Sequence, residues 1–436
     1  MKPNKKLLYI IVGILFTFTL SYSQSKEDAY RLSYLGLGFG ARSLGLGTAY
    51  LGVANDFSAV YWNPAGLGRI QLNEITGGFS HLSYNNKSSL FGNEQEFSNS
   101  NTTINSVGIV YPFPVAQGSL VFAIGYGRQN DFASALGFKG FNNVKRIIEY
   151  PDSIELQGKV LENGGINNWI VGGSIEAARG LFIGLSLNFI SGTYTYNRDY
   201  NENDIYNRYY IKGWHQKVTI DEDIGGFTAR AGLLYEFQRA NARLGFNIKF
   251  PSYLSMKENY TDDWTKFADA DMPAVDTLFP YNSYPEFDVV TPFVFSTGLS
   301  WTFGQLMLSG ALDYTDWTEM EFRNVSDPAM LDENTVIKDS LTSTLNFRFG
   351  AELSIPRTDL QLRAGFAYIP SPYRSDKSSN DQKFITAGLG WIVEDAIRFD
   401  VGYAYGFWDT QHEVIYANPT EKITTHNVIA TVSYRF

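Results

Sequence analysis

The last fifteen residues of the chain, KITTHNVIATVSYRF, alternate apolar and polar side chains. The apolar positions are Val428, Ala430, Val432, Tyr434 and Phe436. Successive side chains of a strand point to opposite faces, so this pattern predicts one apolar and one polar face. Such a strand suits the boundary between lipid and an aqueous lumen. Because the chain stops on an aromatic residue with no tail, we expect this strand to close a barrel.

The N-terminus has the pattern of a secretory signal. Three lysines precede an apolar run from Leu7 to Leu20, and Ser21 and Ser23 lie three and one positions before Gln24. Residues 1–23 are therefore predicted to be cleaved after Ser23. No later segment has the roughly twenty apolar residues that a membrane-spanning helix needs. Only a closed barrel could then cross a bilayer, because an open sheet edge would leave backbone groups unpaired in hydrocarbon.

The composition agrees with a barrel and excludes several other classes. Aromatic residues make up 16% of the chain, with 28 Tyr and 32 Phe, and barrels place aromatic girdles at both membrane interfaces. The formal charge of -10 argues against nucleic-acid binding, which requires a basic face. The absence of cysteine excludes a lipoprotein anchor and disulfides.

The pattern predicts an all-β fold with fourteen strands. These fall near residues 70–85, 101–113, 117–129, 165–178, 181–197, 214–237, 241–257, 287–303, 305–322, 341–355, 359–370, 382–393, 396–409 and 422–436. An even number of strands is expected when both ends of the chain lie on one side.

Short and long connections alternate between these strands. The short ones are 114–116, 179–180, 238–240, 304, 356–358 and 394–395. The long ones are 86–100, 130–164, 198–213, 258–286, 323–340, 371–381 and 410–421. A transmembrane antiparallel β-barrel sorts its connections in this way, with periplasmic turns and extracellular loops. A soluble β-sandwich, the alternative, has no reason to do so.

Residues 24–69 precede the first convincing strand and are predicted to form a plug, or hatch, inside the lumen of the 70–436 barrel. The strand at 396–409 shows why the lumen has room: Phe399 and Val401 share one face, whereas Gly402 and charged Asp400 lie on the other. Charges assign that face to the lumen, and inward glycines leave space beside the wall. A loose periplasmic extension is the alternative for the N-terminal segment. A dinucleotide-binding loop is poorly supported, since the glycines lack the GxGxxG spacing and lie in no βαβ unit.

Specific motifs carry a resemblance to a known family. Residues 40–67, GARSLGLGTAYLGVANDFSAVYWNPAGL, are similar to the N-terminal signature of the FadL/TodX-type outer-membrane transporters of long-chain fatty acids and other hydrophobic compounds. LRAGFAYIPSPY at 362–373 and TAGLGW at 386–391 resemble later blocks of that family. The NPAG block also occurs in related barrels that serve protein secretion.

The resemblance implies passive uptake of a hydrophobic molecule. Loops capture the ligand, a pocket in the barrel holds it, and a shift of the hatch opens a route, with exit sideways into the membrane or into the periplasm. A partner-binding or shuttle barrel of a secretion system is the alternative. A buried apolar cavity would favour transport, and a flat loop surface without a cavity would favour the partner role.

Three groups of residues are candidates for a site. The hatch motif is Asn63, Pro64, Ala65 and Gly66, where Asn63 would tie the hatch to the wall, or these residues could only end a helix and start the first strand. Loop aromatics could capture ligand, or simply pack together; they are Phe132, Phe138, Phe141, Trp264, Phe267 and Phe279. Lumenal Arg348, Arg363 and Arg398 could hold a carboxylate or latch the plug, or pair across the lumen.

No enzyme, cofactor or metal site is expected. The four histidines are scattered without metal-ligand spacing, and no GxSxG elbow is present. The expected partners are a hydrophobic small molecule, outer-membrane lipid and lipopolysaccharide, and the outer-membrane assembly machinery, which recognises a C-terminal aromatic. The predicted location is the outer membrane of a Gram-negative cell.

Overall fold

The computed structural model describes residues 25–141, 154–207, 211–268, 276–411 and 418–436; the expected signal sequence, residues 1–23, lies outside them. The described residues form one antiparallel sheet that closes into a fourteen-stranded barrel, as predicted. Closure comes from β1 (Glu74–Leu90) and β19 (Thr420–Arg435), which pair along their lengths. This pairing gives the backbone groups of both strands partners inside the sheet, as a bilayer requires.

The remaining strands follow the wall in chain order. They are β2 (Asn93–Phe113), β3 (Leu120–Asp131), β4 (Ser134–Phe141), β5 (Ile154–Ala178), β6 (Leu181–Asp204), β7 (Ile211–Phe237), β8 (Ala242–Lys249), β9 (Tyr253–Ala268), β10 (Asp276–Ser283), β11 (Glu286–Val290), β12 (Val294–Phe303), β13 (Leu306–Asp316), β14 (Glu321–Arg323), β15 (Ser343–Ser354), β16 (Leu360–Ile369), β17 (Gln382–Val393) and β18 (Ile397–Gln411). There are more segments than wall strands because some wall strands are interrupted. Pro251 separates β8 from β9 and Pro292 separates β11 from β12, since proline cannot donate to a ladder.

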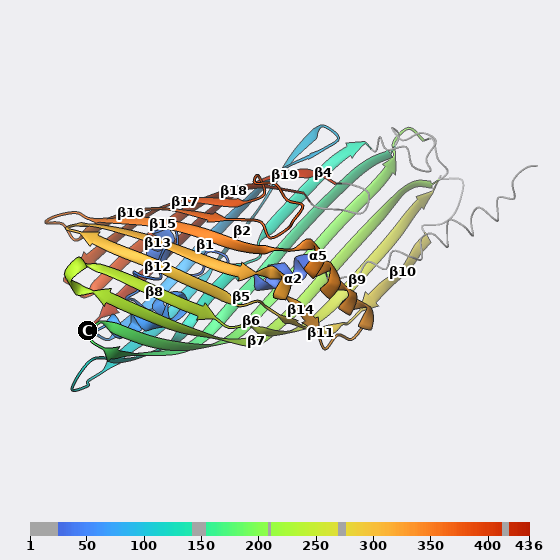
Figure 1. Ribbon diagram of the computed structural model, residues 1–436. Coiled ribbons are helices and arrows are strands. Elements are labelled where there is room, and N and C mark those ends of the chain that lie inside the picture. Colours follow the sequence, from blue (N-terminus) through green and yellow to red (C-terminus); the bar gives the residue numbers. More distant parts are fainter. Residues whose placement is uncertain (1–24, 142–153, 208–210, 269–275, 412–417) are drawn as a thin grey trace, which may run out of the picture.

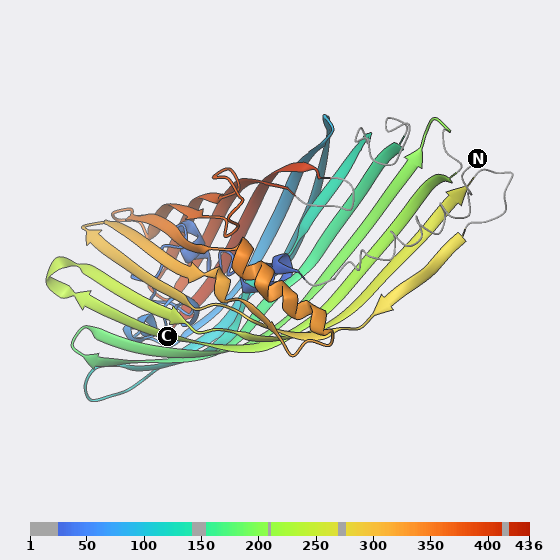
Figure 2. The ribbon, with the colours of Figure 1, turned by 45° about the vertical axis from the view of Figure 1, so that its right-hand side comes forward.

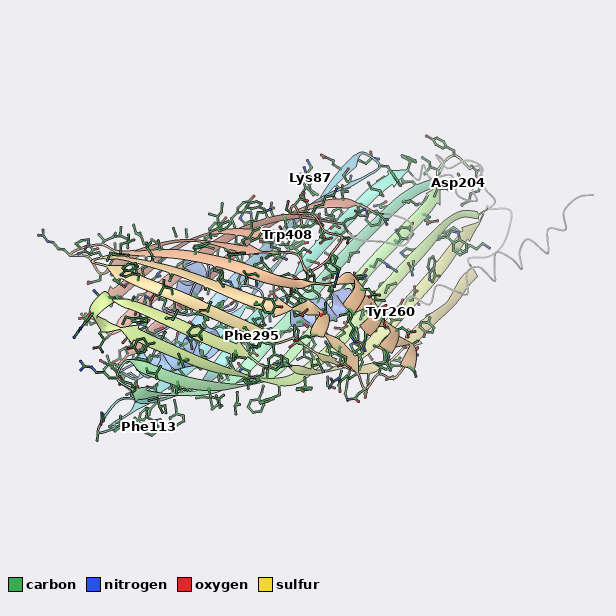
Figure 3. All side chains as sticks on the ribbon, in the orientation of Figure 1. Lys87, Phe113, Asp204, Tyr260, Phe295 and Trp408 are labelled. Atoms are coloured by element: carbon green, nitrogen blue, oxygen red, sulfur yellow. The ribbon has the colours of Figure 1, made fainter. Side chains whose placement is uncertain are left out.

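The two ends of the barrel differ. Phe113 lies at the end with short turns, whereas Asp204 lies at the tip of a one-sided extension of the wall (Figures 1 and 3). β5, β6 and β7 have 25, 24 and 27 residues, more than twice the nine to eleven or so that cross a bilayer. On β6 the outward side chains are apolar up to Phe189 and polar from Thr193 onward. The bilayer therefore ends near that point, and the extension projects beyond it.

Several strands are longer than the sequence pattern predicts. Residues 86–100, expected to be a loop, instead form the hairpin between β1 and β2, which turns at Phe91 and Gly92. Beyond the membrane neither face of a strand must be apolar, so the alternation that marks a strand fades while the ladder continues.

The N-terminal segment fills the barrel near the short-turn end (Figures 1 and 2). It contains α2 (Lys26–Ser33), α3 (Ala41–Gly45), α4 (Ala59–Trp62) and the 3-10 helix η1 (Pro64–Arg69), and the side chains between Gly38 and Gly68 are almost all buried. The connection between β13 and β15 contains the 3-10 helices η4 (Trp317–Glu319) and η5 (Pro328–Asp332) and helix α5 (Glu333–Ser340). Helix α5 contacts α2 of the N-terminal segment. The 3-10 helix η3 (Gln238–Ala240) forms the short turn between β7 and β8. Among the described residues, no helix combines the length and apolar character needed to cross a membrane.

Candidate functional site

Wall glycines form the seat of the plug. A Cβ atom on Gly184 of β6 would lie 2.3 Å from the carbonyl carbon of Pro64, and one on Gly365 of β16 would lie 2.2 Å from the backbone nitrogen of Gly47. Only glycine permits such an approach of two backbones. The wall glycines in close contact with the plug backbone or side chains include Gly108, Gly125, Gly127, Gly184, Gly232, Gly245, Gly298, Gly350, Gly365, Gly388 and Gly402. The spacing of inward glycines in the sequence thus marks where the plug meets the wall.

Asn63 links the plug to the wall through its side-chain amide. Its Nδ2 donates to the carbonyl oxygen of Leu51 in the plug (3.1 Å) and to that of Leu233 in β7 (3.2 Å). Its Oδ1 accepts from the backbone nitrogen of Ala65 at 3.2 Å. The side chain is fully buried, so each of these groups would otherwise lack a partner.

The rest of the hatch motif fits closely around this link. Pro64 begins η1, where its missing N–H costs nothing. The hydroxyl of Ser174 in β5 donates to the carbonyl oxygen of Ala65 at 3.0 Å. A Cβ on Gly66 would lie 2.4 Å from the carbonyl oxygen of Ala54, so this position requires glycine. The motif holds the end of the plug against the wall.

A buried chain of ion pairs joins the plug to the opposite wall. Arg42 of α3 contacts both carboxylate oxygens of Glu352 in β15, at 2.8 and 2.7 Å. Glu352 also accepts from Arg363 Nε at 2.7 Å. Arg363 Nη1 and Arg398 Nε then lie 2.7 and 2.8 Å from the oxygens of Asp400, although the angles at these two contacts fall outside hydrogen-bond geometry. All five residues are at most 8% exposed.

A cavity of about 340 Å³ lies on the side of the plug that faces the strand extension. Its walls come from α2 and the following segment, and from β1, β3, β17, β18 and β19. Six aromatic side chains line it: Tyr30, Tyr34, Tyr84, Phe132, Phe384 and Trp408. For comparison, an apolar cavity of about 150 Å³ holds benzene. We call this space the upper cavity; it has the size and lining of a small-molecule site.

Helix α2 presents a cluster of paired charges beside the upper cavity, in which only Nε of Arg31 lacks a hydrogen-bond partner among the described residues. Arg31 contacts Glu222 Oε2 (2.9 Å) and Asp28 Oδ1 (3.1 Å), and its guanidinium carbon lies 3.3 Å from the centre of the Tyr194 ring. Burial lowers the pKa of Arg31, but these neighbouring acids outweigh it and raise the pKa, so Arg31 stays charged. Burial raises the pKa of the Asp28 carboxyl.

Two tyrosines of the plug segment keep their protons at neutral pH. Burial raises the pKa of the Tyr30 and Tyr34 phenols above the ordinary value. The Tyr34 hydroxyl donates to Gln382 Oε1 at 2.6 Å. Both rings therefore line the upper cavity as neutral groups.

The backbone ladder of the barrel wall is interrupted next to the upper cavity. The ladder between β2 and β3 ends at the pair Ser106 and Gly127. Among the described strands, the rest of β2 pairs with β1, and the rest of β3 and all of β4 pair with β5. We call the boundary between residues 93–105 and 128–141 the seam.

Side chains close the seam in place of a backbone ladder. Asn101 Nδ2 donates to Asp131 Oδ2 at 2.7 Å, and Asn99 Nδ2 donates to the carbonyl oxygen of Ser134 at 3.1 Å. Residues 128–134 also line the upper cavity. Side-chain bonds thus hold the wall together beside the upper cavity, and Asn86 and Ser88 of β1 add two more, to the carbonyl oxygens of Ala135 and Gly137 in β4.

The structure places the predicted loop aromatics in different surroundings. Phe132 lines the upper cavity, and Phe138 is buried in a neighbouring cluster with Leu136 and Tyr200. Phe141 is half-buried at the end of β4. Trp264 packs edge-on against Trp214, with ring centres 6.3 Å apart, in the extension.

The other two aromatics of this set lie far along the extension. Phe267 is exposed near the end of β9, and Phe279 lies in β10, where its side chain is outside the described part of the structure. Phe132 is thus the one described member of the set that lines the upper cavity.

The three predicted lumenal arginines lie in ion pairs. Arg363 and Arg398 belong to the chain around Asp400 described above, and Arg348 pairs with Asp313 of β13. Their surroundings match the alternative interpretation, pairing across the lumen. Arg363 in particular bonds to the same carboxylate, that of Glu352, as the plug residue Arg42.

Most of the residues that line the upper cavity belong to no motif in the sequence. Tyr30 and Tyr34 lie in a segment expected to be plug, and Gln382, Phe384 and Trp408 lie on wall strands. The available signal was their position: the three wall residues fall on the inward face at the outer ends of predicted strands. Within the described residues, no group of three or more acidic or histidine side chains could hold a metal ion.

A closed barrel with a seated plug defines the class: this is an outer-membrane β-barrel transport protein. The chain belongs to the family described as outer membrane protein transport protein (OMPP1/FadL/TodX), whose model matches residues 41–433. That family is made up of transport channels rather than enzymes. The match confirms the resemblance seen in the 40–67 motif. No curated protein matched the chain in a sequence comparison.

Solved structures share this fold at low sequence identity. The toluene transporter TodX of Pseudomonas putida superposes with a TM-score of 0.62 at 15% identity, covering 92% of this chain and 99% of TodX. A Pseudomonas aeruginosa FadL homologue gives 0.59 at 12% identity, covering 93% and 99%. The monoaromatic hydrocarbon channel CymD gives 0.54 at 14%, covering 92% and 99%. At these identities the likeness concerns the fold.

Proposed function

We propose that this protein mediates passive uptake of hydrophobic small molecules across the outer membrane, and that the upper cavity is its binding site. The proposal rests on one observation: an aromatic-lined cavity lies between a seated plug and an interruption of the wall. Burial of each methylene of a ligand there contributes about 0.8 kcal/mol. Related barrels of the same fold are described as transporters of toluene and of monoaromatic hydrocarbons, and fatty acids are the other candidate cargo.

The position of the cavity supports sideways exit through the seam. A ligand in the upper cavity touches Phe132 and Ala133, which lie where β3 gives way to β4. Exit towards the periplasm would instead require displacement of a plug that is held by the Arg42–Glu352 pair and by Asn63. Parting the seam leaves the buried Arg42–Glu352 pair and the bonds of Asn63 in place.

The alternative of a secretion partner fits this geometry less well. That role needs an exposed loop surface and gives no reason for a cavity inside the barrel. The size and aromatic lining of the upper cavity favour transport.

Uptake by whole cells tests the proposal. A deletion strain would be complemented with the wild-type chain or with Leu82→Trp, which places a large ring in the upper cavity from β1. We expect Leu82→Trp to reduce uptake of toluene or laurate to the level of the deletion strain, with normal barrel assembly on semi-native gels. Leu331→Trp, at an exposed loop position, is the matched control. Uptake unchanged in the deletion strain, together with failed protein secretion, would refute the proposal.

A further inference from the structure

The polar groups of the upper cavity select among hydrophobic ligands. Resting on the function proposed above, we infer that the cavity takes a small neutral aromatic molecule that carries a hydroxyl group, a phenol, in preference to an alkyl carboxylate or a plain hydrocarbon.

The aromatic side chains are arranged for a ring. Trp408 of β18 contacts Tyr84 of β1 and Phe384 of β17, with ring centres 6.4 and 6.2 Å apart. On the plug side, Tyr30 and Tyr34 pack with ring centres 5.7 Å apart. Flat ligands gain from offset and edge-to-face contacts with such rings, which a flexible alkyl chain cannot match.

Side-chain amides supply hydrogen bonds that a hydrocarbon would leave unused. The Oδ1 atom of Asn427 in β19 is buried and accepts no hydrogen bond from the described residues. The Oε1 atom of Gln382 accepts a hydrogen bond from the Tyr34 hydroxyl. The amide N–H groups of Gln382 have no partner among the described contacts. Both side chains line the upper cavity. A hydroxyl both donates and accepts, so it can satisfy either group, whereas an apolar ligand leaves them unsatisfied.

The charges of the lining argue against an anion. Arg31 is paired with Glu222 and Asp28, and Arg128 with Asp131 at 2.8 Å. These are the two cationic residues in the described lining of the cavity, which also contains Glu162. A carboxylate entering here would meet cations already paired with protein carboxylates, so it would lose its hydration without gaining an unpaired cation. A neutral phenol has no such cost.

Matched ligands test the inference directly. The mature protein would be placed in lipid nanodiscs, and binding of radiolabelled p-cresol, toluene and laurate measured by equilibrium dialysis, with empty nanodiscs subtracted. p-Cresol and toluene differ by one hydroxyl. We expect p-cresol to bind about fivefold or more tightly than toluene, the effect of one to two hydrogen bonds, and laurate to bind most weakly.

Two variants assign the effect to Asn427. Asn427→Leu should bring p-cresol and toluene to within about twofold of each other by removing one hydrogen bond, without weakening toluene. Asn247→Leu is the matched control, because Asn247 of β8 also has a buried Oδ1 without a partner in the described structure but does not line the upper cavity. It should leave the p-cresol preference unchanged.

The possible failures are distinguishable. Equal binding of p-cresol and toluene, tighter binding of laurate, or an unchanged preference in Asn427→Leu would overturn the phenol assignment while leaving uptake through the cavity intact. Absence of binding for all three probes, and no effect of Leu82→Trp on their uptake, would overturn both.

Discussion

Arg42 of the plug and Glu352 of the wall form a buried two-point ion pair. The two side chains are 310 residues apart in the sequence, and their atoms lie 2.8 and 2.7 Å apart. Glu352 also bonds to Arg363, so one carboxylate compensates two guanidinium groups. A buried ion pair adds little over an apolar pair of the same shape, but removing one partner leaves the other charge uncompensated.

Neutralising Glu352 should therefore release the plug without unfolding the barrel. We expect Glu352→Gln to weaken plug docking by about 3–5 kcal/mol, and Arg42→Met by less, because Arg42→Met leaves Glu352 paired with Arg363. Ion conductance in planar bilayers should rise in the order wild type, Arg42→Met, Glu352→Gln, while heat-modifiable migration on gels stays normal. Equal conductance in all three proteins would contradict a latch role for this pair.

Asn63 provides a second and independent attachment. Asn63→Ala should leave barrel assembly intact, because the residue lies in the plug, and should alter uptake. It removes the side-chain donor to the carbonyl groups of Leu51 and Leu233. Because Leu233 is paired with strands on both sides, the main cost is the Leu51 carbonyl, at about 1–3 kcal/mol for a buried group left unsatisfied. Asn63→Asp is the informative comparison, since it keeps the acceptor for Ala65 but loses both donations. Loss of the folded barrel on semi-native gels in Asn63→Ala would show that the residue supports the wall instead.

The membrane-embedded part of the fold was predictable from the sequence. A strand that faces lipid on one side and a filled lumen on the other must alternate apolar and polar residues. In β18, Phe399 and Val401 are 41% and 44% exposed, whereas the neighbouring residues Arg398 and Asp400 are buried. Glycines at inward positions also predicted a filled lumen, because they leave space beside the wall that another segment can occupy.

The extension and the upper cavity were not predictable in this way. Asn197 and Asp199 point outward and Arg198 points to the other face, so polar residues occupy both sides of β6 and no alternation of hydropathy remains. In the cavity, Tyr34 and Gln382 are 348 residues apart and meet only through closure of the barrel and seating of the plug. A single sequence carries no local signal for that contact.

The seat of the plug makes a steric prediction. Gly365→Ala places a Cβ 2.2 Å from the backbone nitrogen of Gly47, so the plug must shift away from β16 at about 1–3 kcal/mol, the usual cost of overpacking. Gly310→Ala is the control, since the nearest atoms to its Cβ lie 3.8 Å away. Limited proteolysis should cleave the plug faster in Gly365→Ala than in Gly310→Ala. Equal cleavage rates in the two variants would show that the plug does not pack against β16 as closely as the structure shows.

A cross-link across the seam tests whether ligands leave sideways through the wall or past the plug. Asn101 and Asp131 face one another across it at 2.7 Å, and the chain contains no native cysteine, so cysteines at these two positions can be joined by a short, reducible bifunctional reagent. If ligands leave sideways, cross-linking should block uptake and reduction should restore it, because a covalent bridge replaces bonds that must break. A bridge between Lys87 and Glu94, which pair at 2.7 Å within the β1–β2 hairpin, should have no effect. Full uptake through the Asn101–Asp131 cross-linked protein would instead direct the ligand past the plug, and the Glu352→Gln variant should then take up ligand faster than wild type.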